Sequence, residues 1–264
     1  MGDEGTSWDK AQEKTTVRRI ILDYSRQQIT GSTLELLFDL ADRMGLTERM
    51  SELRTGYSVN YTEKKAVLHH FLRMPKSYYE NSSRVPMMGD QDRLKDVWGV
   101  NGRIYDYSEK VRGGFIRGIT DKVLKNVLCI TSGGVHYGPE AVYEALRADK
   151  DASEATKGRG LTLSFVNNVD PVDFDIKIRN LKADETLFII ISKSFDSMVT
   201  MYNVRMARRW LQKSLSAQEL EFSDIEMVGK HFCAITADYD QASQVSDLER
   251  HVFMSMHKKH IYKF

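Results

Sequence analysis

Short apolar runs alternate with amphipathic segments from about Asn126 onward, and this alternation constrains the fold more than any other feature of the sequence. Runs rich in Ile, Val and Phe are expected to form strands at residues 126–131, 161–166, 186–192, 231–236 and 251–256. Segments with apolar residues at three-four spacing are expected to form the intervening helices at 139–148, 171–180, 199–215 and 244–250. Because strands of this composition need cover on both faces, the pattern predicts an α/β fold, a three-layer α-β-α sandwich with a five-stranded, mainly parallel sheet.

Residues 1–110 show a different pattern, which predicts a helical N-terminal arm. Apolar side chains recur at helical spacing in two segments, 18–28 and 32–46. A further helix is expected to begin at Asn60 or Thr62, because Asn and Thr cap helix N-termini, and to end before Pro75. The sequence therefore predicts two domains, the arm at 1–110 and the α/β domain at 111–264.

The charges of the chain nearly cancel, since 38 Lys and Arg accompany 37 Asp and Glu, and the net charge is +1. This balance favours neither a nucleic acid nor a membrane as partner, and the longest apolar run, at 187–191, is far too short to cross a bilayer. Any bound anion must therefore be held by a local site. The sequence starts without the apolar segment of a secretory signal, and Cys129 and Cys233 lie in apolar runs. We expect two buried free thiols and a cytoplasmic location.

A glycine-containing loop, Thr-Ser-Gly-Gly-Val-His-Tyr-Gly-Pro at 131–139, follows the first expected strand. Ligands of doubly wound sheets bind beyond the carboxyl ends of the strands. Gly133 and Gly134 allow the backbone to approach a ligand, and the next helix offers the free N–H groups of its first turn. The loop is therefore a candidate phosphate cradle, although an ordinary strand-to-helix turn explains the glycines as well. His136 can contact a phosphate here, and its simpler interpretation is a partly exposed loop histidine.

A second polar loop, Ser-Lys-Ser-Phe-Asp-Ser at 192–197, follows the third expected strand. Its hydroxyls and its ammonium group can bind an anion, and they belong to Ser192, Lys193, Ser194 and Ser197. The alternative is helix capping by Ser194 or Ser197. Capping needs one hydroxyl and not three, so the pattern favours an anion site. The glycine loop has the glycine spacing of neither a P-loop nor a dinucleotide-binding motif. His257 and His260 have i, i+3 spacing but no third ligand nearby, so the sequence predicts no metal site.

Four segments of the chain, in order, are similar to motifs of the glucose-6-phosphate isomerase family. VNYTEKKAVLHHFLR resembles N-x-T-E-x-R-A-V-L-H-x-A-L-R, and the glycine loop resembles I-G-I-G-G-S-x-L-G-P. FVNNVDPVDF resembles F-V-S-N-V-D-P-x-D, and LFIIISKSFDSMVT resembles L-F-I-x-x-S-K-T-F-T-T-x-E-T. The chain is identified by this resemblance as the N-terminal portion of a family member, including the first sugar isomerase (SIS) domain, with the second SIS domain of the family absent.

The resemblance implies that the two loops hold the phosphate of a sugar phosphate, and that this chain carries no catalytic residue. The implied phosphate-binding residues are Gly133, Gly134, Ser192, Lys193, Ser194 and Ser197. The chain also departs from the motifs: Val135 replaces a serine of the glycine turn and Val199 replaces a glutamate, while Lys65 replaces an arginine and Thr131 with Ser132 replaces Gly-Ile. Val135 in particular removes one phosphate donor.

By the same resemblance, the implied activity is the interconversion of glucose 6-phosphate and fructose 6-phosphate in glycolysis and gluconeogenesis, with no metal and no nucleotide cofactor. A 1,2-proton shift requires a base and a stabilising cation, which the family takes from its second SIS domain, and no position of this chain matches them. We therefore expect the chain to carry the phosphate-binding half and to be weak or inactive alone. The alternatives are a non-catalytic sugar-phosphate-binding or regulatory module, or a structural partner that forms a homodimer or pairs with a full-length isomerase. Whether the chain is itself an enzyme is left open by the sequence.

Overall fold

The computed structural model describes residues 21, 23–74, 93–147, 149, 160–238 and 261–263. The chain divides into two compact units, Met1–Leu68 and His69–Phe264. The division at residue 110 that the sequence suggests stays a prediction.

The described residues of the first unit form two helices, α2 (Gly31–Arg43) and α3 (Leu46–Thr55). Thr30 caps α2, because its side-chain oxygen accepts a hydrogen bond from Thr33 N at 3.2 Å. Gly45 then adopts a left-handed conformation with φ of 66°, which turns the chain into α3. The helix expected over 32–46 is thus confirmed in type, and it ends a few residues early because of this turn.

The helix expected over 18–28 is wrong in the part that the structure describes. Asp23 accepts a hydrogen bond from Ser25 N at 2.9 Å, and Gln27 N donates to Tyr24 O at 3.0 Å. These bonds form a turn. Short Asp side chains compete for backbone amides in this way, and they thereby oppose helix formation.

The helix expected to begin near residue 60 is also wrong. Asn60 does accept a hydrogen bond from Glu63 N, at 3.2 Å, but its backbone pairs with Lys65 in an antiparallel bridge. The bridge closes a turn where the helix should have continued. Of the expected helix, the described residues contain only the short 3₁₀ helix η1 (His69–Arg73), and Pro75 lies outside the described residues.

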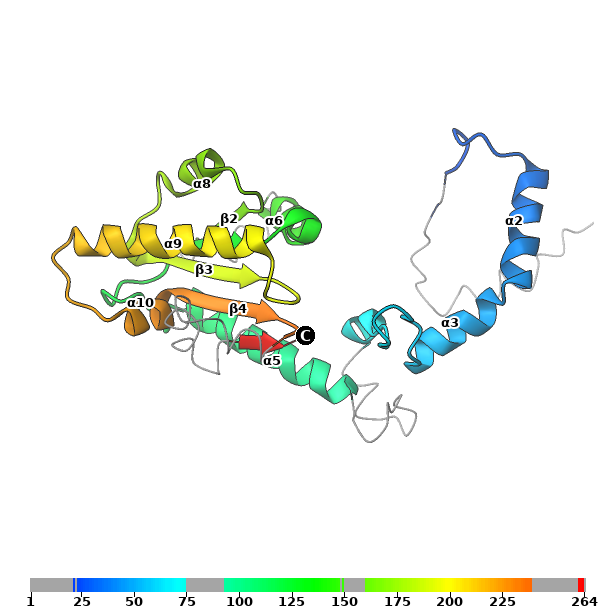
Figure 1. Ribbon diagram of the computed structural model, residues 1–264, viewed down its shortest axis with the longest axis horizontal. Helices are drawn as coiled ribbons and strands as arrows, with labels where there is room; N and C mark the ends of the chain where they lie inside the picture. Colours follow the sequence, from blue (N-terminus) through cyan, green and yellow to red (C-terminus); the bar gives the residue numbers. More distant parts are fainter. Residues whose placement is uncertain are drawn as a thin grey trace, which may run out of the picture. The chain divides into compact units, whose positions relative to one another are not determined.

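The second unit is built on a five-stranded parallel sheet with the strand order β2-β1-β3-β4-β5 (Figure 1). The strands are β1 (Asn126–Ile130), β2 (Thr162–Val166), β3 (Thr186–Ile191), β4 (Phe232–Thr236) and β5 (Ile261–Lys263). The first four confirm the strands expected from the sequence. The strand expected at 251–256 lies outside the described residues, and the three-residue β5 comes after it.

The helices of this unit surround the sheet. They are α5 (Arg93–Arg112), α6 (Tyr137–Arg147), α8 (Pro171–Ile178), α9 (Met198–Ser216) and α10 (Asp224–His231), with the 3₁₀ turns η2 (Gly133–His136) and η3 (Ala183–Glu185). Three expected helices are confirmed as α6, α8 and α9, while the one at 244–250 lies outside the described residues. The sequence reading missed α10, although Ser223 and Glu226 form a capping box at its start.

The two faces of the sheet have separate cores, which gives the predicted three layers. On one face, Phe188 of β3 packs with Phe174 of α8 and Leu211 of α9. On the other face, Leu187 of β3 packs with Val111 of α5. Figure 1 accordingly shows α8 and α9 on one side of the strands and α5 on the other. The α-β-α architecture expected from the sequence is therefore confirmed.

The strand order places a topological switch between β1 and β3. The chain leaves β1 toward β2 on one side and then returns to β3 on the other side, so the two connections diverge from neighbouring strands. In open α/β sheets, ligands bind beyond the carboxyl ends of the strands at such a point. We call the loops at these strand ends the carboxyl edge and those at the opposite ends the amino edge.

Candidate functional site

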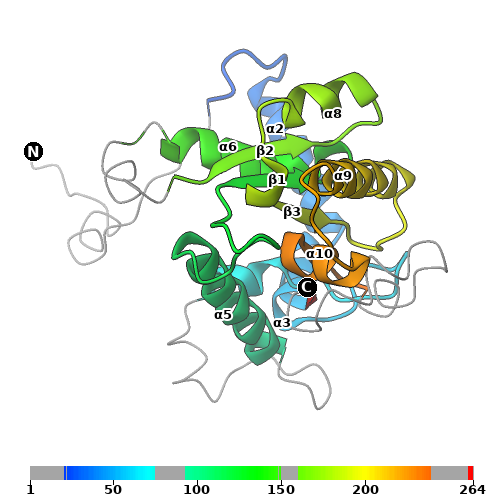
Figure 2. The ribbon, with the colours of Figure 1, turned by 90° about the vertical axis from the view of Figure 1, so that its left-hand side faces the viewer.

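The two loops singled out in the sequence meet at the carboxyl edge. Ile130, the last residue of β1, is in register with Ile190 of β3, so both strands end at nearly the same level. Adjacent strands lie about 4.8 Å apart, and Figure 2 shows β1 and β3 side by side. The glycine loop after β1 and the serine loop after β3 are therefore neighbours, as the sequence predicts. The phosphate-binding role of their residues stays a prediction.

The glycine loop is a 3₁₀ turn that runs directly into α6. Gly133 has a φ of 54°, and a Cβ there would meet no atom within 4 Å, so the backbone conformation alone favours glycine. Gly133 N donates to Asn167 O at 3.3 Å, and Val135 N donates to Ser132 O at 3.5 Å. Two amides of the expected cradle thus already have partners within the protein. The Val135 side chain is 51% exposed and does not enter the core.

The serine loop is folded around a buried aromatic ring. Phe195 is only 1% exposed although its φ is 59°, and its N–H donates to the buried Ser192 Oγ at 3.2 Å. Ser197 is the N-cap of α9, and its Oγ accepts from Thr200 N at 3.5 Å. Capping, the alternative interpretation, therefore accounts for Ser197. It does not account for Ser192 or Ser194.

The carbonyl of Lys193 anchors the same loop to β4. It accepts hydrogen bonds from Thr236 Oγ1 at 3.1 Å and from Ala237 N at 3.0 Å. The loop backbone is thus fixed from both sides, by Phe195 in the core and by the end of β4. Lys193 itself is exposed and lies at the surface of the carboxyl edge.

Sequence reasoning missed a set of buried polar atoms at this edge. Thr131 follows β1, while Thr200 and Asn203 lie in the first two turns of α9, and all three are at most 1% exposed. Within the described residues, Thr131 Oγ1, Thr200 Oγ1 and Asn203 Oδ1 have no hydrogen-bond partner. A buried polar atom without a partner costs about 1–3 kcal/mol, so three of them at one edge indicate a functional constraint. In the sequence, the only indication of this set was that the polar residues Thr200 and Asn203 lie among the apolar residues on the buried side of the α9 segment.

The loop after β2 joins the other two loops. Asn203 Nδ2 donates to Asn168 O at 2.7 Å, and Asn167 Nδ2 lies 2.7 Å from His136 Nε2. His136 Nδ1 is 2.8 Å from Gly133 O, and its Nε2 is 3.4 Å from Glu140 Oε2. His136 is only 6% exposed, so the expectation of a partly exposed loop histidine is wrong. The ring instead connects the glycine loop to the loop after β2.

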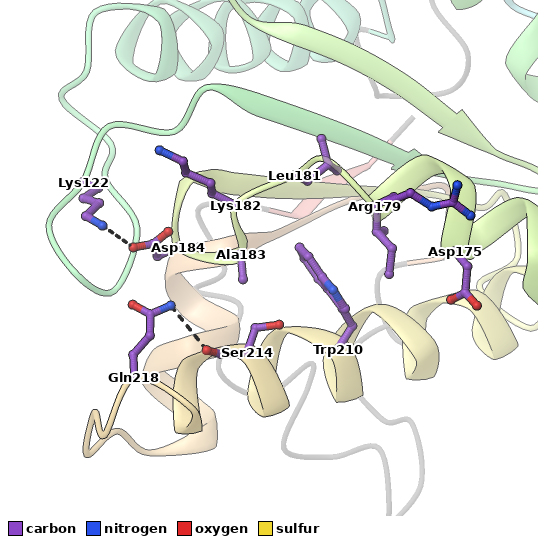
Figure 3. A pocket seen from close by; sticks show the side chains of 11 residues that line it. Lys122, Asp175, Arg179, Leu181, Lys182, Ala183, Asp184, Trp210, Ser214 and Gln218 are labelled. Carbon is purple, nitrogen blue, oxygen red and sulfur yellow. Dashed lines mark hydrogen bonds and ion pairs between the residues drawn. The ribbon is translucent and has the colours of Figure 1, made fainter.

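The amino edge carries a cavity of about 520 Å³, which Figure 3 shows with its lining side chains. Trp210 of α9 faces it, and Arg179 and Lys182 lie at its rim. Its buried carboxylate already has a partner, because Lys122 Nζ lies 2.7 Å from Asp184 Oδ2. Burial opposes ionisation of Asp184, but the hydrogen bond and charge of Lys122 outweigh it and lower the pKa of that carboxyl. This cavity is at the opposite end of the strands from the two loops and is not part of the candidate site.

Other kinds of site find no support in the described part of the chain. No group of three His, Cys, Asp or Glu side chains there could hold a metal ion, and none of its helices is long and apolar enough to span a membrane. Cys129 and Cys233 are buried and free, as expected. Burial raises the pKa of each thiol to about 12, so neither is a nucleophile near neutral pH.

The fold defines a doubly wound α/β protein with two polar loops at its switch point. The sequence model of the phosphoglucose isomerase family matches residues 23–257. Cytosolic glucose-6-phosphate isomerase A of Oryza sativa subsp. japonica is 38% identical over 221 residues, covering 84% of this chain and 36% of its own length. The glucose-6-phosphate isomerase of Nitrosospira multiformis is 36% identical over 225 residues, covering 85% of this chain and 38% of its own length. The chain belongs to the phosphoglucose isomerase family.

A solved structure shares the fold. The crystal structure of a glucose-6-phosphate isomerase from Chlamydia trachomatis matches with a TM-score of 0.60 at 18% identity, over 92% of this chain and 40% of that one. The chain thus spans little more than a third of the length of the curated relatives it matches.

Proposed function

We propose that this chain binds the phosphate group of a sugar phosphate, glucose 6-phosphate or fructose 6-phosphate, at the carboxyl edge of its sheet. The observation that carries the proposal is the convergence of the glycine loop and the serine loop at the switch point, beside three buried polar atoms without partners. A phosphate dianion needs several N–H and O–H donors, and helix N-termini favour negative charge. Both α6 and α9 begin at this edge.

The proposed ligand contacts fall into two groups. Thr131 and Thr200 have hydroxyls that donate to nothing in the described structure. Both side chains are fully buried, so they donate to a ligand only when the surrounding loops shift around it. The phosphate-binding residues expected from the sequence are the second group: Gly133, Gly134, Ser192, Lys193, Ser194 and Ser197. Ser192 Oγ and Ser197 Oγ each accept a hydrogen bond from a backbone N–H, whereas Ser194 Oγ donates to Asp196, so only Ser194 must give up a hydrogen bond to donate to the phosphate.

We further propose that this chain does not isomerise the sugar by itself. Isomerisation moves a proton between two carbons, and it requires a base within hydrogen-bond reach and a cation for the enediolate. The residues that the family resemblance assigns to these tasks have no matching position in the 264-residue sequence. In a coupled isomerase assay we expect turnover no greater than the blank. Turnover well above the blank would contradict this part of the proposal.

Binding itself is tested by calorimetry with 6-phosphogluconate, using gluconate as the matched ligand without phosphate. We expect heat with 6-phosphogluconate only. In Thr200→Val, which removes a donor without breaking a hydrogen bond of the free protein, we expect the affinity to fall about fivefold or more, since a lost hydrogen bond is worth about 1 kcal/mol. No heat at millimolar 6-phosphogluconate would remove the binding proposal.

The second candidate is a structural role, as a homodimer or as a partner of a full-length isomerase. One observation favours it: helix α2 buries none of its residues, and Leu36, Leu37, Phe38 and Leu40 are between 49% and 69% exposed. Exposed apolar patches of this kind are typical of interaction surfaces. Light scattering of the chain alone, and of its mixture with a full-length isomerase, distinguishes the two assemblies. A monomer at every concentration and no mixed complex would remove this candidate.

We also propose that this chain is located in the cytoplasm. Several matching relatives are named as cytosolic glucose-6-phosphate isomerases, and both thiols of this chain are free. Cell fractionation with an antibody to the chain tests it, and recovery in a sealed compartment would contradict it.

A further inference from the structure

The serine loop carries an anion of its own. Ser194 Oγ donates a hydrogen bond to Asp196 Oδ1, so the hydroxyl that should serve a phosphate is already held by a carboxylate. The motif of the family, as given above, has a threonine at the position of Asp196. A neutral donor is thus replaced by a charged acceptor in the middle of the proposed site.

Asp196 also lies where the field of α9 favours an anion. It directly precedes Ser197, the N-cap of this 19-residue helix. The N-terminus of a helix carries the equivalent of about half a positive charge, and it stabilises a carboxylate or a phosphate placed beside it. A carboxylate at this position and a bound phosphate therefore compete for the same favourable field.

The backbone on both sides of Asp196 is fixed. Phe195 is buried and hydrogen-bonded to Ser192, and Ser197 caps α9. Asp196 itself is exposed, so its charge faces the solvent from which a ligand approaches. The loop cannot move this residue away from the carboxyl edge without giving up the burial of Phe195 or the cap.

We propose that Asp196 is a specificity-determining residue of the carboxyl-edge site, which lowers its affinity for dianionic phosphate groups by occupying Ser194 and the N-terminal field of α9. This inference rests on the proposed function, because it places the phosphate at these loops. The carboxylate acts as an internal anion: it repels a dianion, and it withholds one hydroxyl donor. A ligand without a phosphate group, such as gluconate, does not experience the same penalty.

The test compares the wild type with Asp196→Asn, which keeps the shape of the side chain and removes its charge. Asp175→Asn is the matched control, since Asp175 is an exposed acid of the same unit that lines the amino-edge cavity. The probes are inorganic phosphate, 6-phosphogluconate and gluconate, titrated in a calorimeter at one pH and one ionic strength. We expect Asp196→Asn to bind both phosphate probes about tenfold more tightly or better, a change that corresponds to about 1.4 kcal/mol, and Asp175→Asn to match the wild type.

A double-mutant cycle adds a second criterion. Ser194→Ala should change phosphate affinity by less than about threefold in the wild type, because the hydroxyl is already occupied. In an Asp196→Ala background the same change should cost about fivefold or more, because no side-chain oxygen at position 196 then holds the hydroxyl.

The outcomes separate the inference from the proposed function. Equal phosphate affinities for the wild type and Asp196→Asn would overturn the role of Asp196 while leaving the phosphate site in place. An equal gain in Asp175→Asn would also overturn it, since net charge would then explain the effect. No binding of phosphate or 6-phosphogluconate by any of the proteins at millimolar concentration would overturn the phosphate site, and the inference with it.

Discussion

The two edges of the sheet differ in how completely their buried polar groups are hydrogen-bonded. At the amino edge, His231 is fully buried, and its Nδ1 lies 2.7 Å from Thr186 O while its Nε2 accepts from Ile119 N at 3.0 Å. Asp184 at the same edge is paired with Lys122. At the carboxyl edge, Thr131, Thr200 and Asn203 each leave a buried polar atom without a partner among the described residues. Under the proposed function, the amino edge stabilises the domain and the carboxyl edge is the one that binds the ligand.

The largest loss of stability is expected from a substitution where the amino edge is packed most closely. Gly118 lies against Asp184 and His231, so that a Cβ on it would overlap the Asp184 carbonyl oxygen and lie 2.9 Å from His231 Cε1. We expect Gly118→Ala to destabilise the protein by about 3 kcal/mol or more, because a backbone atom cannot move aside cheaply. Urea unfolding measures the change.

Gly138→Ala is the matched control, since a Cβ at Gly138 in α6 meets no atom within 4 Å. It should leave stability unchanged or raise it by up to about 1 kcal/mol through helix propensity. A Gly118→Ala protein as stable as this control would show that the amino edge is not the rigid region described here.

The second prediction concerns the pH dependence of stability. Burial lowers the pKa of His231, and this outweighs the hydrogen bond to Thr186 O and the charge of Asp184, which favour protonation. The folded state therefore resists a proton that the unfolded state accepts. Neutral His231 makes its full contribution to the free energy of unfolding above its ordinary pKa of about 6.5. This contribution is lost as the pH falls toward the lower pKa that the residue has in the folded state. In this window the free energy of unfolding should fall by at most about 1.4 kcal/mol per pH unit from this group.

Urea titrations between pH 8 and pH 5 test this dependence. His231→Gln should be less stable at pH 8, and its stability should vary less between pH 8 and pH 5 than that of the wild type. His69→Gln, at an exposed position of η1, should retain the wild-type slope. An unchanged slope in His231→Gln would contradict the assignment of the pH dependence to His231.

The third prediction compares substitutions of one threonine from each edge. Thr186 Oγ1 donates to Lys182 O at 2.6 Å, whereas Thr131 Oγ1 has no partner in the described structure. Thr186→Val should therefore cost about 1–2 kcal/mol of stability and leave 6-phosphogluconate affinity unchanged. Thr131→Val should cost no stability, and it should weaken 6-phosphogluconate binding about fivefold. The reverse pattern in calorimetry and urea unfolding would contradict the division of roles between the edges.

The sequence was informative where residue type alone decides the structure. Runs such as residues 126–130 and 186–191 bury their apolar side chains when they form strands of a parallel sheet that is covered on both faces. Their strands and the neighbouring loops were therefore predictable. The loop positions followed from the strands, since the carboxyl ends of β1 and β3 had to share an edge once they were neighbours.

The failures arose where side chains act on the backbone or where burial depends on distant segments. Asp23 formed a turn where apolar spacing indicated a helix, and Asn60 formed one where its capping tendency indicated a helix start. Helix α10 has only eight residues and runs directly into β4, so its periodicity was too short to recognise. The burial of His136 and Asn203 depends on the loop after β2, which lies about 30 or more positions away in the sequence, and no local pattern reports such contacts.

Mapping the ligand onto the backbone tests the central claim most directly. In amide-resolved NMR of the isotope-labelled chain titrated with 6-phosphogluconate, we expect the largest shift changes in residues 131–137 and 192–200, at the ends of β1 and β3. Residues 118–122 and 181–186 of the amino edge should stay unchanged and serve as the internal reference. Changes confined to the amino edge, or no changes at saturating ligand, would contradict the assignment of the phosphate site to the carboxyl edge.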